Sequence, residues 1–413
     1  MSKLLTRFLI YLLIIFSLFP YIQILPLGTD SQPNALLIGL FLFPFCCKWK
    51  MNFNLAITFL FMIVAFFLLF ISPLDFNSIR SLMNYMTLFV VSYVSFYALK
   101  KINGLPYGLY KKIVYVWFIV GTIQLFVYPD FLSFLIPRGN SEATMESGRG
   151  IVCLTPEPTF YGITCLILVL LAYLNFRNKP GIKIIYWILF LQIFIYSRSS
   201  LVIFLLIATF GIYLLSSIFR NDKNKIKRIA ILSIFAILFF LIINWSKDYI
   251  TSSRFGKLFF ILLENPETFI LLDASVNERF IHVFFPIYGF IKDFGMPHGF
   301  GSYPNFMVEC FQAPEFQHLF TDYVLQRGAP TRIMSGWGSL LYELGIIGVF
   351  LVYVLYINIS TLLSGQKKLI VFLLMCGILL NAIPFSNPLI PFFIGNLIYL
   401  NYEKRRSEGN FSY

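Results

Sequence analysis

The chain has 413 residues and a mean hydropathy of +0.79, with 58% hydrophobic and only 12% charged residues. A soluble domain cannot bury that much apolar surface, so the composition excludes a soluble globular protein. The apolar stretches are continuous over about 20 residues and do not alternate with period two, which argues against a transmembrane β-barrel. The composition therefore predicts an all-α polytopic membrane protein.

About twelve transmembrane helices are predicted in a single integral membrane domain, residues 1–413. The apolar stretches cover residues 5–26, 34–47, 53–72, 79–99, 113–129, 158–176, 182–197, 199–219, 228–245, 338–360, 368–384 and 388–402. Two more polar segments interrupt them. Residues 130–157 are predicted to form a first outer loop, and residues 246–336 a large outer loop with amphipathic helices between the ninth and tenth spans.

The formal net charge of +13 suggests a nucleic-acid-binding protein, but the distribution of charge argues otherwise. If the N-terminus is cytoplasmic, every inner segment is rich in Lys and Arg. The acidic residues on that side are then only Asp222, Glu403 and Glu408. This repeated pattern follows the positive-inside rule, so we expect both termini in the cytoplasm and no nucleic-acid partner.

The sequence contains no D-x-D or H-E-x-x-H metal pattern, no P-loop and no dinucleotide-binding fingerprint. We therefore expect neither a metal nor a cofactor. The six cysteines have no metal-ligand spacing either. Cys153 and Cys310 would both lie on the outer side, where a disulfide between them is a further hypothesis.

Glu157 is the first candidate for chemistry, because it lies between Pro156 and Pro158 where the first outer loop enters the sixth span. The prolines hold the backbone extended and let the helix begin only at Pro158. A carboxylate held there could take a proton from a sugar hydroxyl. The alternative is that Glu157 only caps the helix.

Two arginines lie close to predicted span ends. Arg198 stands between the seventh and eighth spans with almost no loop, and a charge at the centre of a span would cost roughly 2.5–3.5 kcal/mol. It should therefore face a polar cavity or an anion, unless it extends to lipid headgroups. Arg80 lies at the outer end of the fourth span, where it could also be a simple topological anchor.

The large outer loop holds all three histidines, His282, His298 and His318. Ser275 and Glu278 have the spacing of a capping box, which predicts the start of a helix there. This helix would be kinked by Pro286 and would end near Gly295, with an apolar face that includes Phe280, Phe284, Ile287 and Ile291. The alternative is a membrane-surface helix with solvated polar residues.

Within this helix Arg279 and His282 are three residues apart and share a face. Arg80, Arg149, Arg198 and Arg279 are all predicted on the outer side of the membrane, near the hydrocarbon boundary. Guanidinium groups bind phosphate in a planar, bidentate manner, so these four arginines are candidates for binding a lipid-linked diphosphate.

The chain resembles the Wzy-type O-antigen and surface-polysaccharide polymerases, which share a superfamily with the O-antigen ligases. Arg149-Gly150 and Glu157-Pro158-Thr159 are similar to the R-G…E-P-S segment of that family. Arg279 and Gly295 match its R-x15-G spacing, while Gly299-Phe300-Gly301 and Glu343-Leu344-Gly345-Ile346-Ile347-Gly348 resemble its G-x-G and E-L-G-x-x-G elements. An R-x10-G spacing in the first outer loop is not met. The position of the ligases' catalytic histidine is occupied by Met334, which favours a polymerase.

The resemblance implies a GT-C-like, inverting, metal-independent glycosyltransferase in a bacterial inner membrane, with its active site facing the periplasm or the outside. It would transfer a growing glycan from undecaprenyl diphosphate to a lipid-linked repeat unit, alongside a flippase and a chain-length regulator. Glu157 is expected to act as the base, with His298 and His282 as alternatives. Arg279 is expected to assist catalysis, and His282 and Tyr303 to contact the substrate. An O-antigen ligase, or a transporter or flippase of lipid-linked sugars, remains an alternative.

Overall fold

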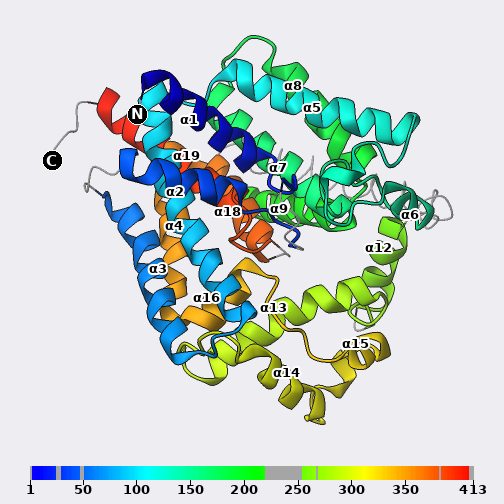
Figure 1. The fold of residues 1–413 in the computed structure, drawn as a ribbon. Helices are drawn as coiled ribbons and strands as arrows, with labels where there is room; N and C mark the ends of the chain where they lie inside the picture. Colours follow the sequence, from blue (N-terminus) through cyan, green and yellow to red (C-terminus); the bar gives the residue numbers. More distant parts are fainter. Residues whose placement is uncertain are drawn as a thin grey trace.

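The computed structural model describes residues 2–24, 29–46, 51–218, 254–266, 268–380 and 383–408, and these residues form helices and connecting loops without a β-strand (Figure 1). The first half contains α1 (Lys3–Leu18), α2 (Asn34–Cys46), α3 (Phe53–Ile71), α4 (Phe76–Ile102), α5 (Tyr107–Phe126), η1 (Ser133–Leu135), α6 (Ser141–Glu146), α7 (Pro158–Phe176), α8 (Ile182–Leu191), η2 (Gln192–Ser197) and α9 (Ser200–Ile218). The second half contains α12 (Arg254–Glu264), α13 (Ala274–Lys292), α14 (Tyr303–Gln312), η3 (Gln317–Leu319), α15 (Asp322–Arg327), α16 (Gly336–Leu344), η4 (Gly345–Val349), α17 (Phe350–Leu362), α18 (Gly365–Leu380) and α19 (Leu389–Ser407).

Each predicted apolar stretch contains a helix except residues 228–245, which lie outside the described residues. Five helical stretches are long and apolar enough to cross a membrane, namely α3, α4, α5, α7 and the stretch from Gly336 to Leu362. The shorter apolar helices are α2, α8 with η2, and α9. These helices are those expected of a helical membrane protein.

Helix α4 lies at the centre of one half of the molecule, where it packs against α2, α3 and α19 (Figure 1). Small residues allow α4 and α19 to approach closely. A Cβ atom at Gly395 would lie 2.5 Å from the carbonyl oxygen of Ser92, and the Ser92 hydroxyl donates to the Pro391 carbonyl at 2.9 Å. Close contact through Gly and Ser is the usual way in which membrane helices associate without a hydrophobic driving force.

Helix α7 is the second central element, and nearly all of its residues are buried against α8, η2, α9 and α19. Gly162 permits this packing, since a Cβ atom there would lie 2.9 Å from the Ser197 hydroxyl oxygen. The N-terminus of α7 is thereby held next to the short connection between η2 and α9.

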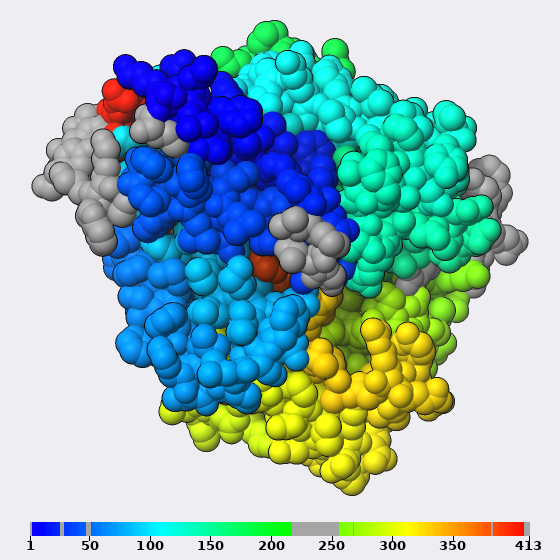
Figure 2. Space-filling view, viewed as in Figure 1, coloured from blue at the N-terminus to red at the C-terminus, as the bar shows by residue number. Residues whose placement is uncertain are grey.

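Helices α13, α14 and α15 form a lobe at one end of the molecule, seen in yellow-green below the blue and cyan helices in Figure 2. The lobe has its own apolar core, made of Ile281, Phe285, Tyr303, Phe306, Met307, Cys310, Phe320, Val324, Ile333 and Tyr342. Helix α13 packs along α16, which joins the lobe to the rest of the chain.

Glycines fix the position of the lobe. Gly345 has a φ of +61°, and a Cβ atom there would overlap the carbonyl oxygen of Gly295 at the end of α13. The Ile346 amide donates to the same carbonyl at 2.8 Å. The predicted span 338–360 is therefore not one continuous α-helix, because the left-handed Gly345 ends α16 and a 3₁₀ turn leads into α17.

Two sequence-based predictions are wrong. Ser275 and Glu278 do not form a capping box, because Asp273 precedes them and its carboxylate accepts the Ser275 amide hydrogen at 2.7 Å, so that α13 begins at Ala274. Cys153 and Cys310 are both free and buried. The Cys153 thiol donates to the Trp117 carbonyl at 3.4 Å, which holds it within the helical core and not beside the lobe.

The α4–α19 contact gives a test of the fold. We expect Gly395→Ala to lower the free energy of unfolding by about 1–3 kcal/mol, because the added methyl group overpacks against Ser92. Thermal unfolding of the purified protein in detergent measures the change. Gly108→Ala in α5 is the matched control, since a Cβ atom there meets nothing within 4 Å. Equal stability of the two variants would contradict the close helix contact.

Candidate functional site

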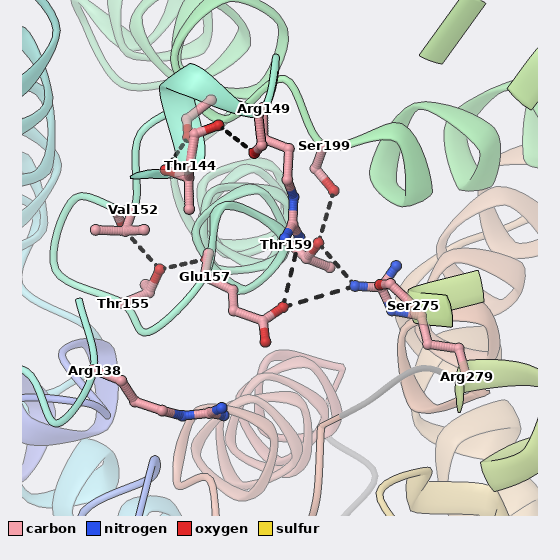
Figure 3. A network of polar contacts seen from close by, with 12 residues as sticks. Arg138, Thr144, Arg149, Val152, Thr155, Glu157, Thr159, Ser199, Ser275 and Arg279 are labelled. Carbon is pink, nitrogen blue, oxygen red and sulfur yellow. Dashed lines mark hydrogen bonds and ion pairs between the residues drawn. The ribbon is translucent and has the colours of Figure 1, made fainter. Parts of the chain in front are cut away.

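Glu157 immediately precedes α7, and Pro158 is the first residue of that helix, as predicted. The Thr155 hydroxyl oxygen lies 2.7 Å from the carbonyl oxygens of both Val152 and Glu157, which holds the turn in place (Figure 3). The Glu157 side chain makes no capping hydrogen bond to α7. The alternative interpretation as a side-chain cap is therefore wrong, and the carboxylate extends away from the helix.

Two guanidinium groups flank the Glu157 carboxylate. Its Oε2 atom lies 3.7 Å from Nη2 of Arg149 and 3.8 Å from Nη2 of Arg279 (Figure 3). Arg279 also donates to the Thr159 hydroxyl at 3.3 Å, and the Ser199 hydroxyl lies 3.4 Å from the same Thr159 oxygen. The first outer loop, α7, the start of α9 and the lobe thus meet around Glu157, at a place that we call the junction.

Arg149 is positioned by the residue that follows it. A Cβ atom at Gly150 would overlap the carbonyl oxygen of Tyr196, and the Ile151 amide donates to that oxygen at 2.9 Å. The outer loop therefore lies directly on η2, a π-helical turn of a kind that is frequent at functional sites. Arg198 follows η2 in a left-handed conformation, with a φ of +42°.

One side of this junction opens into an apolar cavity of about 420 Å³. Arg149, Arg198 and Arg279 line it together with Thr159. Its other walls are mostly apolar side chains from α9, α12, α18 and the connection between α12 and α13, including Leu201, Phe204, Leu205, Leu258, Leu262, Phe269 and Leu380. The apolar cavity therefore combines three guanidinium groups with a hydrocarbon-like lining.

The other side opens into a polar chamber of about 390 Å³. Arg279 and Thr159 line both spaces and form the wall between them. The remaining polar side chains of the polar chamber include Arg138, Glu157, Ser275, Glu278, His282, Arg327, Thr331 and Arg332. Glu157 thus faces the polar chamber, while both of its arginine partners line the apolar cavity.

The arginines of the polar chamber differ in their pairing. Arg138 donates to Asp30 at 2.7 Å, which raises the pKa of Arg138, and Arg327 pairs with Glu278. Arg332 is less well paired, since its only ion pair among the described residues is with Asp30 at 3.9 Å. Burial and the charge of Arg80 lower the pKa of Arg332 to about 10.

The predicted site residues fall into three groups. Arg149, Glu157, Arg198 and Arg279 come together at the junction, and His282 lies in the polar chamber. Arg80 lies apart from the junction, in a small cavity that it shares with Asp30 and Arg332.

His298 and Tyr303, the third group, line neither space. The His298 ring stacks on Tyr342 with 4.1 Å between centroids, and its two nitrogens contact Asp293 at 2.6 Å and the Tyr342 carbonyl at 3.2 Å. Tyr303 is buried in the lobe core, and its hydroxyl donates to the Ile281 carbonyl at 3.2 Å. Both side chains have structural contacts here.

Four residues that line these spaces were not predicted as site residues, namely Arg138, Thr159, Arg327 and Arg332. A signal for two of them exists, because Arg327 and Arg332 bracket the turn sequence Gly-Ala-Pro-Thr in the large outer loop. Searches against protein-family profiles, curated proteins and solved structures find no match to this chain. The resemblance noted above therefore stays a prediction.

The environment of His282 leads us to expect that the stability of the fold depends on pH. Burial, with Arg332 and Arg327 adding to it, lowers the pKa of His282 to about 3. The unfolded chain takes up this proton near pH 6.5, so stability falls on acidification below that value, by up to about 1.4 kcal/mol per pH unit. We expect His282→Gln to flatten the dependence of the thermal midpoint on pH between 6.5 and 4.5. His318→Gln, at an exposed position, should leave it unchanged.

Proposed function

We propose that the protein is a membrane glycosyltransferase of the polysaccharide-polymerase type. It transfers a growing glycan from undecaprenyl diphosphate to a lipid-linked repeat unit. The observation that carries the proposal is the position of Glu157. The Glu157 carboxylate lies between Arg149 and Arg279, where an apolar cavity and a polar chamber adjoin. The proposal includes the twelve-span topology, cytoplasmic termini and a site that faces outward.

The apolar cavity suits the donor lipid. Its aliphatic and aromatic walls match a polyprenyl chain, and Arg149, Arg198 and Arg279 match a diphosphate. Each charge-assisted hydrogen bond to an arginine contributes about 1.5–3 kcal/mol. These contacts strengthen as the leaving diphosphate gains charge, which is the form of transition-state stabilisation that raises the rate.

The polar chamber suits the sugars. An acceptor hydroxyl beside Glu157 gives its proton to the carboxylate as the oxygen attacks the anomeric carbon of the donor. The bond from that carbon to the diphosphate oxygen breaks, and the oxygen keeps the electron pair. Arg279 and Thr159 line both spaces. A nucleophile in the polar chamber and a leaving diphosphate in the apolar cavity would then lie on opposite faces of the anomeric carbon, and attack opposite the leaving group inverts its configuration.

Glu157→Gln tests the base. In a strain that lacks the native protein, we expect this variant to produce single repeat units in place of a polymer ladder, because loss of a general base costs about 10²–10⁴-fold in rate. Gel separation of the surface polysaccharide measures the outcome. Glu142→Gln in the same outer loop, at an exposed position, is the control and should give full ladders. Full ladders from Glu157→Gln would refute the site. Normal polymerisation without transfer of the polymer to its final acceptor would indicate a ligase, and repeat units held on the cytoplasmic side a transporter.

A second experiment tests whether the apolar cavity binds the donor lipid. Farnesyl diphosphate should bind the purified protein more tightly than inorganic diphosphate, since only the former has an apolar chain. Ala208 lines the apolar cavity, and Ala208→Phe should fill part of it. We expect that variant to lower the affinity for farnesyl diphosphate about tenfold and to change the affinity for inorganic diphosphate little, as measured by calorimetry. Equal weakening of the two ligands would contradict the assignment of the cavity to the lipid.

A further inference from the structure

The polar chamber carries more positive charge than its own acids balance. Among the described residues, the chamber and the adjoining small cavity are lined by five arginines and three acids: Arg80, Arg138, Arg279, Arg327 and Arg332, with Asp30, Glu157 and Glu278. One of these acids, Glu157, also faces Arg149. A chamber with an excess of guanidinium groups favours an anionic ligand.

Arg332 is the arginine with the most to gain from a ligand. It lines both the polar chamber and the small cavity, and its side chain is 30% exposed. Its single ion pair in the described chain, 3.9 Å to Asp30, is too long for a hydrogen bond. A partly buried guanidinium that lacks hydrogen-bond acceptors is costly, and a carboxylate would supply two in bidentate geometry.

The other polar side chains of the chamber provide a second observation. Glu157, Ser275 and Thr331 line it, together with His282, whose Nδ1 atom is itself buried away from the chamber. A hydroxyl group can donate to the Glu157 carboxylate and can donate to or accept from the hydroxyls of Ser275 and Thr331. Sugar hydroxyls are therefore well matched to this lining.

The lining also argues against a second lipid diphosphate here. Few large apolar side chains line the polar chamber, such as Phe160, Ile281 and Val324, and six charged side chains line it with them, whereas most of the side chains that line the apolar cavity are apolar. A prenyl chain would lie against arginines. A sugar that bears a carboxylate meets both requirements, since it offers an anion and several hydroxyls in one rigid ring.

We infer that the polar chamber recognises a carboxylate-bearing sugar of the repeat unit, with Arg332 as the main contact to the carboxylate. This inference rests on the proposed function for the source of the sugar. The recognition itself follows from the side chains of the polar chamber. Arg327 and Arg138, on the chamber's other walls, add to the positive potential.

The experiment uses the full chain in detergent, with methyl β-D-glucuronide and methyl β-D-glucoside as probes and saturation-transfer NMR titration as the measurement. We expect the glucuronide to bind at least about tenfold more tightly, because only it can form charge-assisted hydrogen bonds. Arg332→Gln should abolish that preference and Arg332→Lys should restore part of it. Arg327→Gln, at a side chain 64% exposed, should weaken the preference without affecting folding.

Arg198→Gln is the matched control, because Arg198 lines only the apolar cavity of the two spaces. Arg198→Gln should weaken the binding of farnesyl diphosphate and leave the binding of the glucuronide unchanged. Equal binding of the two glycosides, or a glucuronide preference that survives in a folded Arg332→Gln variant, would overturn the inference, and so would an undiminished preference in Arg327→Gln. Displacement of the glucuronide by inorganic diphosphate at lower concentration would also overturn it, in favour of a second diphosphate site. Failure of the polymerase proposal is a separate result, seen as full ladders from Glu157→Gln.

Discussion

The arrangement of this site depends on one set of contacts, the pairing of Glu157 with Arg149 and Arg279. The carboxylate belongs to the start of α7, one guanidinium to the first outer loop and the other to the lobe. More than a hundred residues separate Glu157 from Arg279 along the chain, so this contact requires the lobe to be docked correctly. An ion pair of this geometry contributes little by itself. It forms only when the start of α7, the first outer loop and the lobe lie next to one another.

The docking of the lobe follows from the two ends of α13. Arg279 lies in its second turn, and Gly295 lies just beyond its C-terminus. The close contact between Gly295 and Gly345 fixes the far end, so the length of the helix determines where Arg279 can reach. The sixteen-residue spacing of Arg279 and Gly295 therefore has a physical meaning, because a helix rises about 1.5 Å per residue. Any insertion within α13 would move the guanidinium away from Glu157.

Periodicity and apolar length in the sequence were enough to predict the helical class and most helix positions, because burial in a bilayer requires long apolar segments. Local turn chemistry also predicted the start of α7 at Pro158. Local rules could not predict those helix ends and side-chain positions that depend on tertiary contacts. Asp273 displaced the expected capping box, and Gly345 broke an apolar stretch that looked continuous. His298 and Tyr303 had the chemistry of site residues, yet packing placed them in structural contacts.

The two spaces differ in lining while sharing Arg279 and Thr159. This difference fixes the orientation of a ligand that has an apolar tail, an anionic centre and a polar head. The tail fits the apolar cavity, the anionic centre fits the arginines at the junction, and the head fits the polar chamber. The anionic centre would then lie where Arg149 and Arg279 already hold Glu157. Both guanidinium groups also line the apolar cavity, so an anion on that side would contact the same two side chains as the Glu157 carboxylate. Binding of such a ligand would therefore link the same elements that the carboxylate brings together.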